Sequence, residues 1–151
     1  MRAPHAQPRN LWRVFRRLPV AEQRLTLRAF VTLPAIGLGL RLFGFNRMLR
    51  LLAAWSASPP RAADDTDLVA RAVDRAARRW PAEATCLTRS LLLWWFLRRR
   101  GQPAAVWVGV RHGPQALEAH AWVELAGRVL NDRPDVRERY APFEQPLAAT
   151  P

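Results

Sequence analysis

The spacing of apolar residues predicts helices in the first part of the chain. Apolar positions recur with helical periodicity over residues 19–33, and Pro34, Gly37 and Gly39 are expected to break this helix. A second helix is expected from about residue 38 or 40 to Trp55. The Ser- and Pro-containing stretch 56–60 then predicts a linker, which separates a segment 1–60 from residues 61–151.

Two more helices are expected after this linker. Residues 64–67 are Asp, Asp, Thr and Asp, which suit a helix N-terminus, and apolar residues continue with helical spacing to Trp80. The next helix is expected to start at Thr85, whose hydroxyl can cap it, so that Cys86 lies in its first turn. Arginines 98–100 suit the negative end of that helix, and Gly101 ends it.

Beyond residue 101 the apolar period changes from 3.6 to 2, which indicates strands. We expect strands over residues 105–111, 117–124 and 128–132, with a turn at 112–114 between the first two. Helices followed by antiparallel strands predict an α+β fold, in which a helix packs on a small antiparallel sheet. We expect the N-terminal helical segment and this core to form one structural unit.

Composition and charge add a division between the two parts. The chain has 151 residues, about half of them apolar, and a net charge of +12 that comes from arginine alone because lysine is absent. Residues 1–61 hold 11 arginines and one acid, whereas residues 62–151 hold 13 arginines and 11 acids. The basic amphipathic segment 1–60 therefore suits a membrane surface, an acidic partner or nucleic acid. Nucleic acid is disfavoured because the aromatic residues keep helical spacing.

The location predicted from the sequence is the cytoplasm, with peripheral membrane contact left open. The apolar run 29–40 has 12 residues and includes a proline and two glycines, whereas a spanning helix needs about 20 apolar residues. We interpret the run as a buried or interfacial helical hairpin. A single cysteine allows no internal disulfide, and we recognise no signal peptide.

Three residues in the second part could form a catalytic triad. A catalytic cysteine reacts as its thiolate, which the helix N-terminus expected at Cys86 favours. His120 would be the base, and Asp132 would hold its ring in the required tautomer. His112 is a weaker candidate for the base because it lies in a Gly-Pro turn. The histidines do not form a pattern typical of a metal site. The sequence has no Gly-rich loop of the kind that binds the phosphates of a nucleotide cofactor.

The triad hypothesis predicts a particular strand register. With a two-residue loop at Ala126 and Gly127, His120 and Asp132 would lie on opposite faces of the sheet. A three-residue loop 125–127 would pair Glu124 with Arg128 and bring His120 directly opposite Asp132. Each residue also has a plain interpretation: Cys86 as an inert buried thiol, His120 as a core histidine, and Asp132 as a turn residue.

The sequence around these residues resembles the transglutaminase-like B2 proteins of lasso peptide biosynthesis. The motifs that carry the resemblance are CLTRSLLLWW from Cys86, AHAWVE around His120 and GRVLND ending at Asp132. The resemblance implies a papain/transglutaminase-like core, with Cys86, His120 and Asp132 in the triad positions. It also implies a cysteine protease that removes the leader from a ribosomally made precursor peptide.

The resemblance further implies partners. In that family a small recognition protein, B1, delivers the leader; no segment before residue 60 resembles it, so a separate B1-type protein is expected. A lasso cyclase would act next on the freed peptide. The oxyanion would be held by the backbone N–H of Cys86, and by the indole of Trp80, which stands where papain-type proteases carry a glutamine; Trp80 as an ordinary core residue is an equal alternative.

Two other functions stay open from the sequence. The same triad could transfer its acyl group to an amine instead of water, as a transglutaminase does. Alternatively, the chain could be a non-catalytic module whose basic face binds nucleic acid or anionic lipid. Loss or retention of activity in a Cys86→Ala variant separates the catalytic functions from the binding module.

Overall fold

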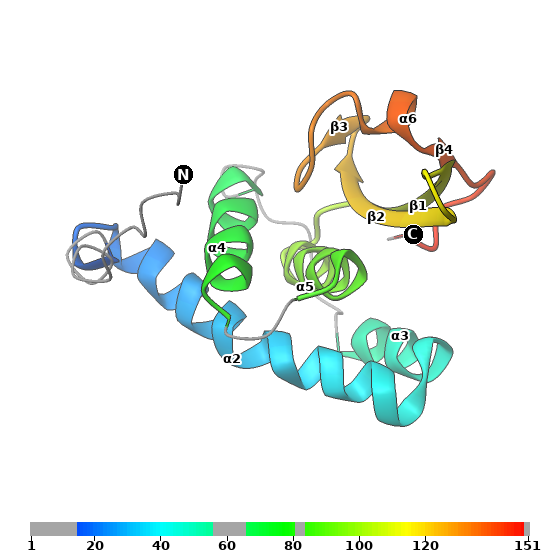
Figure 1. Ribbon diagram of the computed structural model, residues 1–151. Helices are drawn as coiled ribbons and strands as arrows, with labels where there is room; N and C mark the ends of the chain where they lie inside the picture. Colours follow the sequence, from blue (N-terminus) through cyan, green and yellow to red (C-terminus); the bar gives the residue numbers. More distant parts are fainter. Residues whose placement is uncertain (1–14, 56–65, 81–83, 150–151) are drawn as a thin grey trace, which may run out of the picture.

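The computed structural model describes residues 15–55, 66–80 and 84–149 (Figure 1). The helices are α2 (Val20–Phe43), α3 (Phe45–Ala54), α4 (Thr66–Arg79), α5 (Cys86–Arg98) and the short α6 (Val136–Arg139). The strands are β1 (Ala104–His112), β2 (Leu117–Leu125), β3 (Arg128–Val129), β4 (Ala141–Pro142) and β5 (Ala148–Ala149). The expected linker 56–60, the aspartates at 64 and 65, and Pro81 lie outside the described residues.

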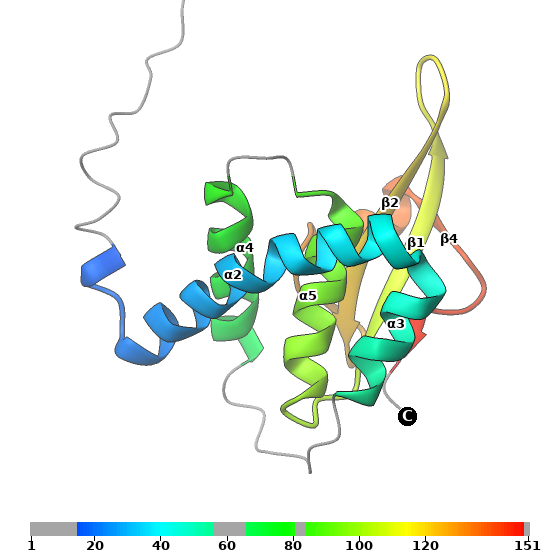
Figure 2. The ribbon, with the colours of Figure 1, turned by 90° about the horizontal axis from the view of Figure 1, so that it is seen from below.

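Helix α5 is the centre of the molecule. It packs against β1 and β2 on one side and against α2 and α4 on the other, so that α2 crosses over the helices on the side away from the sheet (Figures 1 and 2). Its side chains from Ser90 to Leu97 are all buried, with no preferred polar face. A helix that is apolar all round is stable only when it is enclosed on all sides, and this arrangement encloses it.

The expected break at Pro34 is wrong, because α2 continues without interruption to Phe43. Proline in a helix removes one N–H donor and usually weakens the helix. Here Ala29, Leu33 and Ile36, which are at most 1% exposed, continue one buried face past the proline, and packing on α4 and α5 outweighs its cost. The helix ends at Gly44, whose φ of 74° suits glycine.

The continuous helix also removes the argument that this stretch is too short to cross a bilayer. By length and composition alone, α2 could span a membrane, and core helices of soluble proteins meet the same criteria. The predicted second helix is shifted as well: it starts at Phe45 instead of residue 38 or 40.

The α+β prediction is confirmed. The five-stranded antiparallel sheet has the order β3-β2-β1-β4, with β5 also paired to β1, and α5 packs on its convex side (Figure 1). The expected strands 105–111 and 117–124 match β1 and β2 within a residue at each end. The third strand is shorter than expected, because only Arg128 and Val129 pair with β2.

The predicted three-residue loop between β2 and β3 is wrong. Leu125 pairs with Arg128 and Glu124 with Val129, so the loop has two residues, Ala126 and Gly127. Both have positive φ, at 49° and 77°, as the tight hairpin turn that matches the strand twist requires.

Candidate active site

Cys86 is the first residue of α5, as the sequence predicts. Thr85 is the N-cap: its side-chain oxygen accepts a hydrogen bond from the backbone N–H of Thr88 at 3.2 Å. Because the first N–H groups of a helix have no partner within it, the backbone around Cys86 presents donors and the positive end of the helix dipole. The thiol is free and partly buried.

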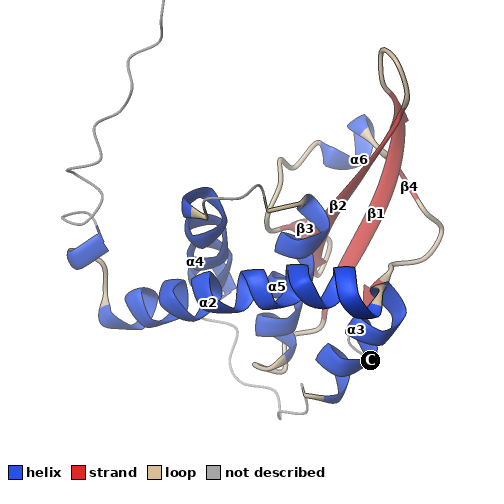
Figure 3. Ribbon diagram, turned by 60° about the horizontal axis from the view of Figure 1, so that its bottom comes forward, coloured by secondary structure: helices blue, strands red, loops and turns tan. Residues whose placement is uncertain are grey.

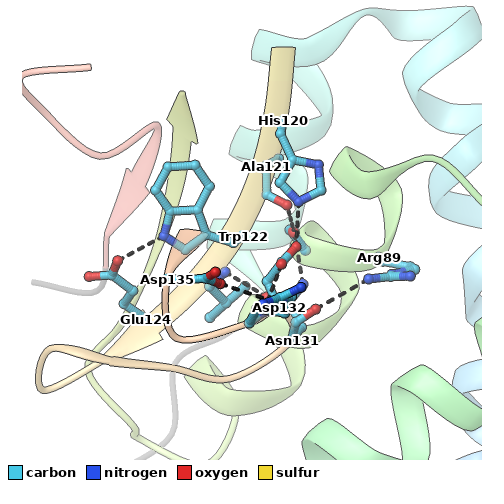
Figure 4. Close-up of polar contacts among 11 residues, drawn as sticks. Arg89, His120, Ala121, Trp122, Glu124, Asn131, Asp132 and Asp135 are labelled. Carbon is cyan, nitrogen blue, oxygen red and sulfur yellow. Dashed lines mark hydrogen bonds and ion pairs between the residues drawn. The ribbon is translucent and has the colours of Figure 1, made fainter. Parts of the chain in front are cut away.

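His120 and Asp132 are in direct contact. The imidazole Nε2 of His120 lies at hydrogen-bond distance from a carboxylate oxygen of Asp132 (Figure 4). The other carboxylate oxygen accepts a bond of 2.7 Å from the backbone N–H of Arg133. Burial alone would raise the pKa of Asp132, but the hydrogen bonds from His120 and Arg133 and the charges of His120 and Arg139 outweigh it and hold the pKa below its ordinary value.

This contact forms although the register argument excluded it. After Val129 the chain leaves the ladder: Leu130 N–H still donates to Val123 O at 2.9 Å, but the side chain of Asn131 takes the N–H of Val123 at 2.7 Å. Asp132 therefore lies in a loop, where strand alternation no longer decides its direction. The argument failed because it assumed that strand pairing continues to residue 132.

Ser90 and Asn131 join the helix to the sheet beside the histidine. The Ser90 hydroxyl is fully buried; it donates to the carbonyl of Ala121 at 3.0 Å and accepts from Asn131 Nδ2 at 2.9 Å. Arg89 donates to the carbonyl of Asn131 at 3.2 Å (Figure 4). These bonds fix the neighbours of His120 and of Asp132 to the same turn of α5.

Tyr140 contacts the His120 ring. Its ring stacks on His120 with centroids 4.9 Å apart, and it is buried in a small cluster with Trp122 and Val136 on the far face of the sheet. Sequence analysis missed Ser90, Asn131 and Tyr140 as site residues. The polar pair Asn131-Asp132 after a strand was a signal for the second of these, whereas nothing local marks Ser90 or Tyr140.

Trp80 and His112 lie apart from this network. Trp80 follows α4 and packs into the core through an edge-to-face contact with Phe30, at 4.9 Å between centroids. This packing gives its predicted oxyanion role no support. His112 is the exposed last residue of β1.

A pocket of about 550 Å³ lies next to Asp132, between α4 and the loop after β3. Side chains of both charge signs line it; they include Asp74 and Arg78 from α4, Arg89 from α5 and Arg133 from the loop. Among the residues that the structure describes, no group of three or more His, Cys, Asp or Glu side chains could hold a metal ion.

Comparisons with known proteins identify the family of the chain. The family model of the transglutaminase-like superfamily matches residues 30–145. The microcin J25-processing protein McjB of Escherichia coli is 39% identical over 57 residues, which is 38% of this chain and 26% of that protein. No solved structure matches. The two matches bear out the resemblance found in the sequence.

Proposed function

The chain belongs to the transglutaminase-like superfamily, and we propose that it is a cysteine peptidase that removes the leader from a ribosomally made lasso precursor peptide. Cys86 is the proposed nucleophile, His120 the base and Asp132 the residue that orients the base. The observation that carries the proposal is the contact between His120 of β2 and Asp132 of the loop after β3, in a chain whose one cysteine begins the central helix.

The orientation of α5 supports the nucleophile. Ser90 lies one helical turn after Cys86 and therefore on the same face, and its hydroxyl reaches the residue next to His120. β1 begins soon after α5 ends, and its first residue pairs with Leu125 at the end of β2. The C-terminal end of α5 is thus near the end of β2, so Cys86 and His120 lie toward the same end of the α5–β2 pair, although the described residues show no hydrogen bond between them.

The contact with Asp132 assigns the two ring nitrogens. Because Nε2 faces the carboxylate, Nδ1 is the nitrogen that takes the thiol proton. The thiolate attacks the scissile carbonyl carbon, and the tetrahedral intermediate collapses to a thioester as the amine leaves with the proton from Nδ1. Water then attacks the thioester, gives its proton to Nδ1 and releases the leader as a carboxylate, which restores the thiol.

The backbone N–H of Cys86 is the proposed first oxyanion donor, since it lies at the start of a helix. Trp80 is retained as a predicted second donor, to be tested by substitution. The fixed carboxylate keeps the negative charge that stabilises the imidazolium in the transition state, and its lowered pKa preserves that charge across the physiological range.

The proposed partners are those that the resemblance to the lasso peptide B2 proteins implies, and the similarity to McjB, whose name describes processing of microcin J25, is consistent with them. They are a precursor leader peptide, a separate B1-type leader-recognition protein and, downstream, a lasso cyclase. The charged pocket beside Asp132 is the proposed contact surface for the peptide, because it adjoins the base-orienting carboxylate.

Incubation with a precursor peptide and its recognition protein tests the reaction. Mass spectrometry is expected to find leader and core with a summed mass one water above the precursor. The Cys86→Ala variant should release nothing, and His120→Ala should lose roughly a thousandfold in rate. His112→Ala is the matched control and should retain the wild-type rate. Leader release by Cys86→Ala would refute the mechanism.

The thiol can also be tested without any precursor. Since the chain has one cysteine, its alkylation by iodoacetamide reports on one atom. If His120 accepts the thiol proton, His120→Ala should slow alkylation about tenfold, whereas His112→Ala should not. Equal alkylation rates in the two variants would show that His120 does not accept the proton of the Cys86 thiol.

Transfer to an amine is the second candidate, because the family match itself describes transglutaminase-like proteins. The chemistry is the same up to the thioester. Product mass distinguishes the two, since acyl transfer joins the amine to the peptide and adds no water.

A further inference from the structure

Helix α2 is apolar on two faces, but the described part of the chain covers only one of them. The inner face packs on α4 and α5, whereas the side chains of a second apolar set are 57–66% exposed. This set, the outer face of α2, consists of Val20, Leu27, Val31, Leu38 and Leu42. An apolar helix is normally enclosed on all sides, so the exposed set indicates a contact with another molecule.

The outer face is a narrow, continuous stripe. At about 100° per residue, its five side chains fall within an arc of about 60°. At about 1.5 Å per residue, the stripe is about 33 Å long from Val20 to Leu42. Helix α2 lies along the outside of the helical layer, away from the sheet, so a flat surface could approach the whole length of the stripe (Figures 1 and 3).

The charge around the stripe is of one sign. Arg24, Arg28 and Arg41 are exposed on α2, and no carboxylate of the described residues forms an ion pair with them. Glu22, the one acid of residues 15–55, is buried and paired with Arg75. The exposed surface of this helix therefore combines aliphatic side chains with arginine and carries no exposed acid.

A pocket beside the stripe adds further positive charge. It has a volume of about 590 Å³ and lies between α2 and the C-terminal end of α5. Arg28, Arg99 and Arg100 line it together with Thr32, and among the described residues no acidic side chain does. Guanidinium groups such as those of Arg28 and Arg99 are ordinary protein ligands of phosphate.

We propose that the outer face of α2 docks this protein on an anionic lipid surface. The helix lies in the plane of the membrane, the stripe enters the apolar boundary, and Arg28 and Arg99 bind a lipid phosphate. The positive charge around the stripe favours an anionic lipid surface over a second copy of this chain. A second copy would bring the same arginines together and repel, whereas anionic headgroups neutralise them. The proposal is independent of the proposed peptide cleavage.

Vesicle flotation tests the proposal with the full chain. The protein is expected to float with vesicles that contain phosphatidylglycerol, to stay unbound with phosphatidylcholine alone, and to dissociate as salt is raised. Replacing Leu27, Val31 and Leu38 by Gln should weaken binding at least about tenfold, because it removes the inserted apolar area. Leu117→Gln, at an equally exposed site on β2, is the matched control and should bind normally.

A second variant tests the pocket. Arg28→Gln with Arg99→Gln should reduce both the affinity for anionic vesicles and its dependence on salt. Circular dichroism and thermal unfolding verify that every variant is folded. Vesicle binding is measured without any cleavage, so the result does not depend on peptidase activity.

Four outcomes would overturn the proposal. The first two are failure to bind anionic vesicles and equal binding to neutral vesicles. The third is resistance of the membrane-bound protein to alkaline carbonate extraction, which would indicate a spanning helix. The fourth is a dimer or partner complex that the triple variant dissociates while lipid binding stays unchanged.

Discussion

The two sides of α5 are held together by different interactions. Toward the sheet, the buried Ser90 and the loop residues Asn131 and Asp132 form directional hydrogen bonds around His120. Toward α2, the contacts are apolar, and Leu33 of that helix is part of the central hydrophobic cluster. Hydrogen bonds fix distances and angles, whereas apolar contacts fix only proximity. The first side is therefore suited to chemistry and the second to support.

This difference gives the two sides different sensitivities. On the sheet side, exchange of a single atom should change activity with little change in packing volume. On the α2 side, loss of volume should change stability, and the position of the residue on the inner or outer face should decide by how much. Each variant below tests one half of this comparison.

The largest effect is expected at Asp132. Asp132→Asn preserves shape but removes the charge that orients and stabilises the His120 ring, so the rate of leader cleavage should fall by roughly 10³ to 10⁴. Single-turnover cleavage of the precursor measures it. Asp135→Asn, which alters only a partly exposed ion pair with Arg133, is the control and should cleave normally. An unaffected rate in Asp132→Asn would remove this carboxylate from the mechanism.

A second variant pair tests the faces of α2. Leu33 is 1% exposed and Leu27 60% exposed in the same helix. Leu33→Ala should lower the free energy of unfolding by about 2–5 kcal/mol, because it leaves a cavity in the core. Leu27→Ala should change it by no more than about 0.5 kcal/mol, since the side chain is in water. Urea denaturation measures both, and equal losses would mean that the outer face is covered in the free protein.

The bond network at Ser90 is expected to have an intermediate effect. Ser90→Ala leaves Asn131 Nδ2 and the Ala121 carbonyl without this partner in a buried place, so stability should fall by about 1–3 kcal/mol. Asn131→Ala and the double variant complete a cycle. Because the two residues share one bond, the combined loss should be smaller than the sum of the single losses. Strict additivity would show that the residues act separately.

The sequence predicted those features that depend on local signals. Thr85 as the cap before Cys86 and the extents of β1 and β2 followed from capping chemistry and alternation. The path through Pro34 could not be predicted locally, because packing on α4 and α5 decides it.

The contact between His120 and Asp132 was predicted, but for a partly wrong reason. His120 and Asp132 were paired correctly, but through a three-residue loop that does not exist. The real cause is Asn131, whose side chain replaces a backbone partner of β2 and lets the chain leave the ladder. This hydrogen bond depends on the tertiary structure, and the periodicity of apolar residues does not predict it.

The smallest expected effect is the dependence of stability on pH, which distinguishes the two sides by charge. The pKa of Asp132 is below its ordinary value in the folded protein, since hydrogen bonds and nearby positive charges outweigh burial. Its contribution to stability is therefore complete above the ordinary pKa and is lost as pH falls through the lowered one. The difference in unfolding free energy between wild type and Asp132→Asn should shrink as the pH is taken from neutral to acid. The difference between wild type and Leu33→Ala should stay constant, because leucine does not titrate. Urea denaturation at a series of pH values measures both, and a constant difference for Asp132→Asn would mean that its carboxylate has the same pKa folded and unfolded.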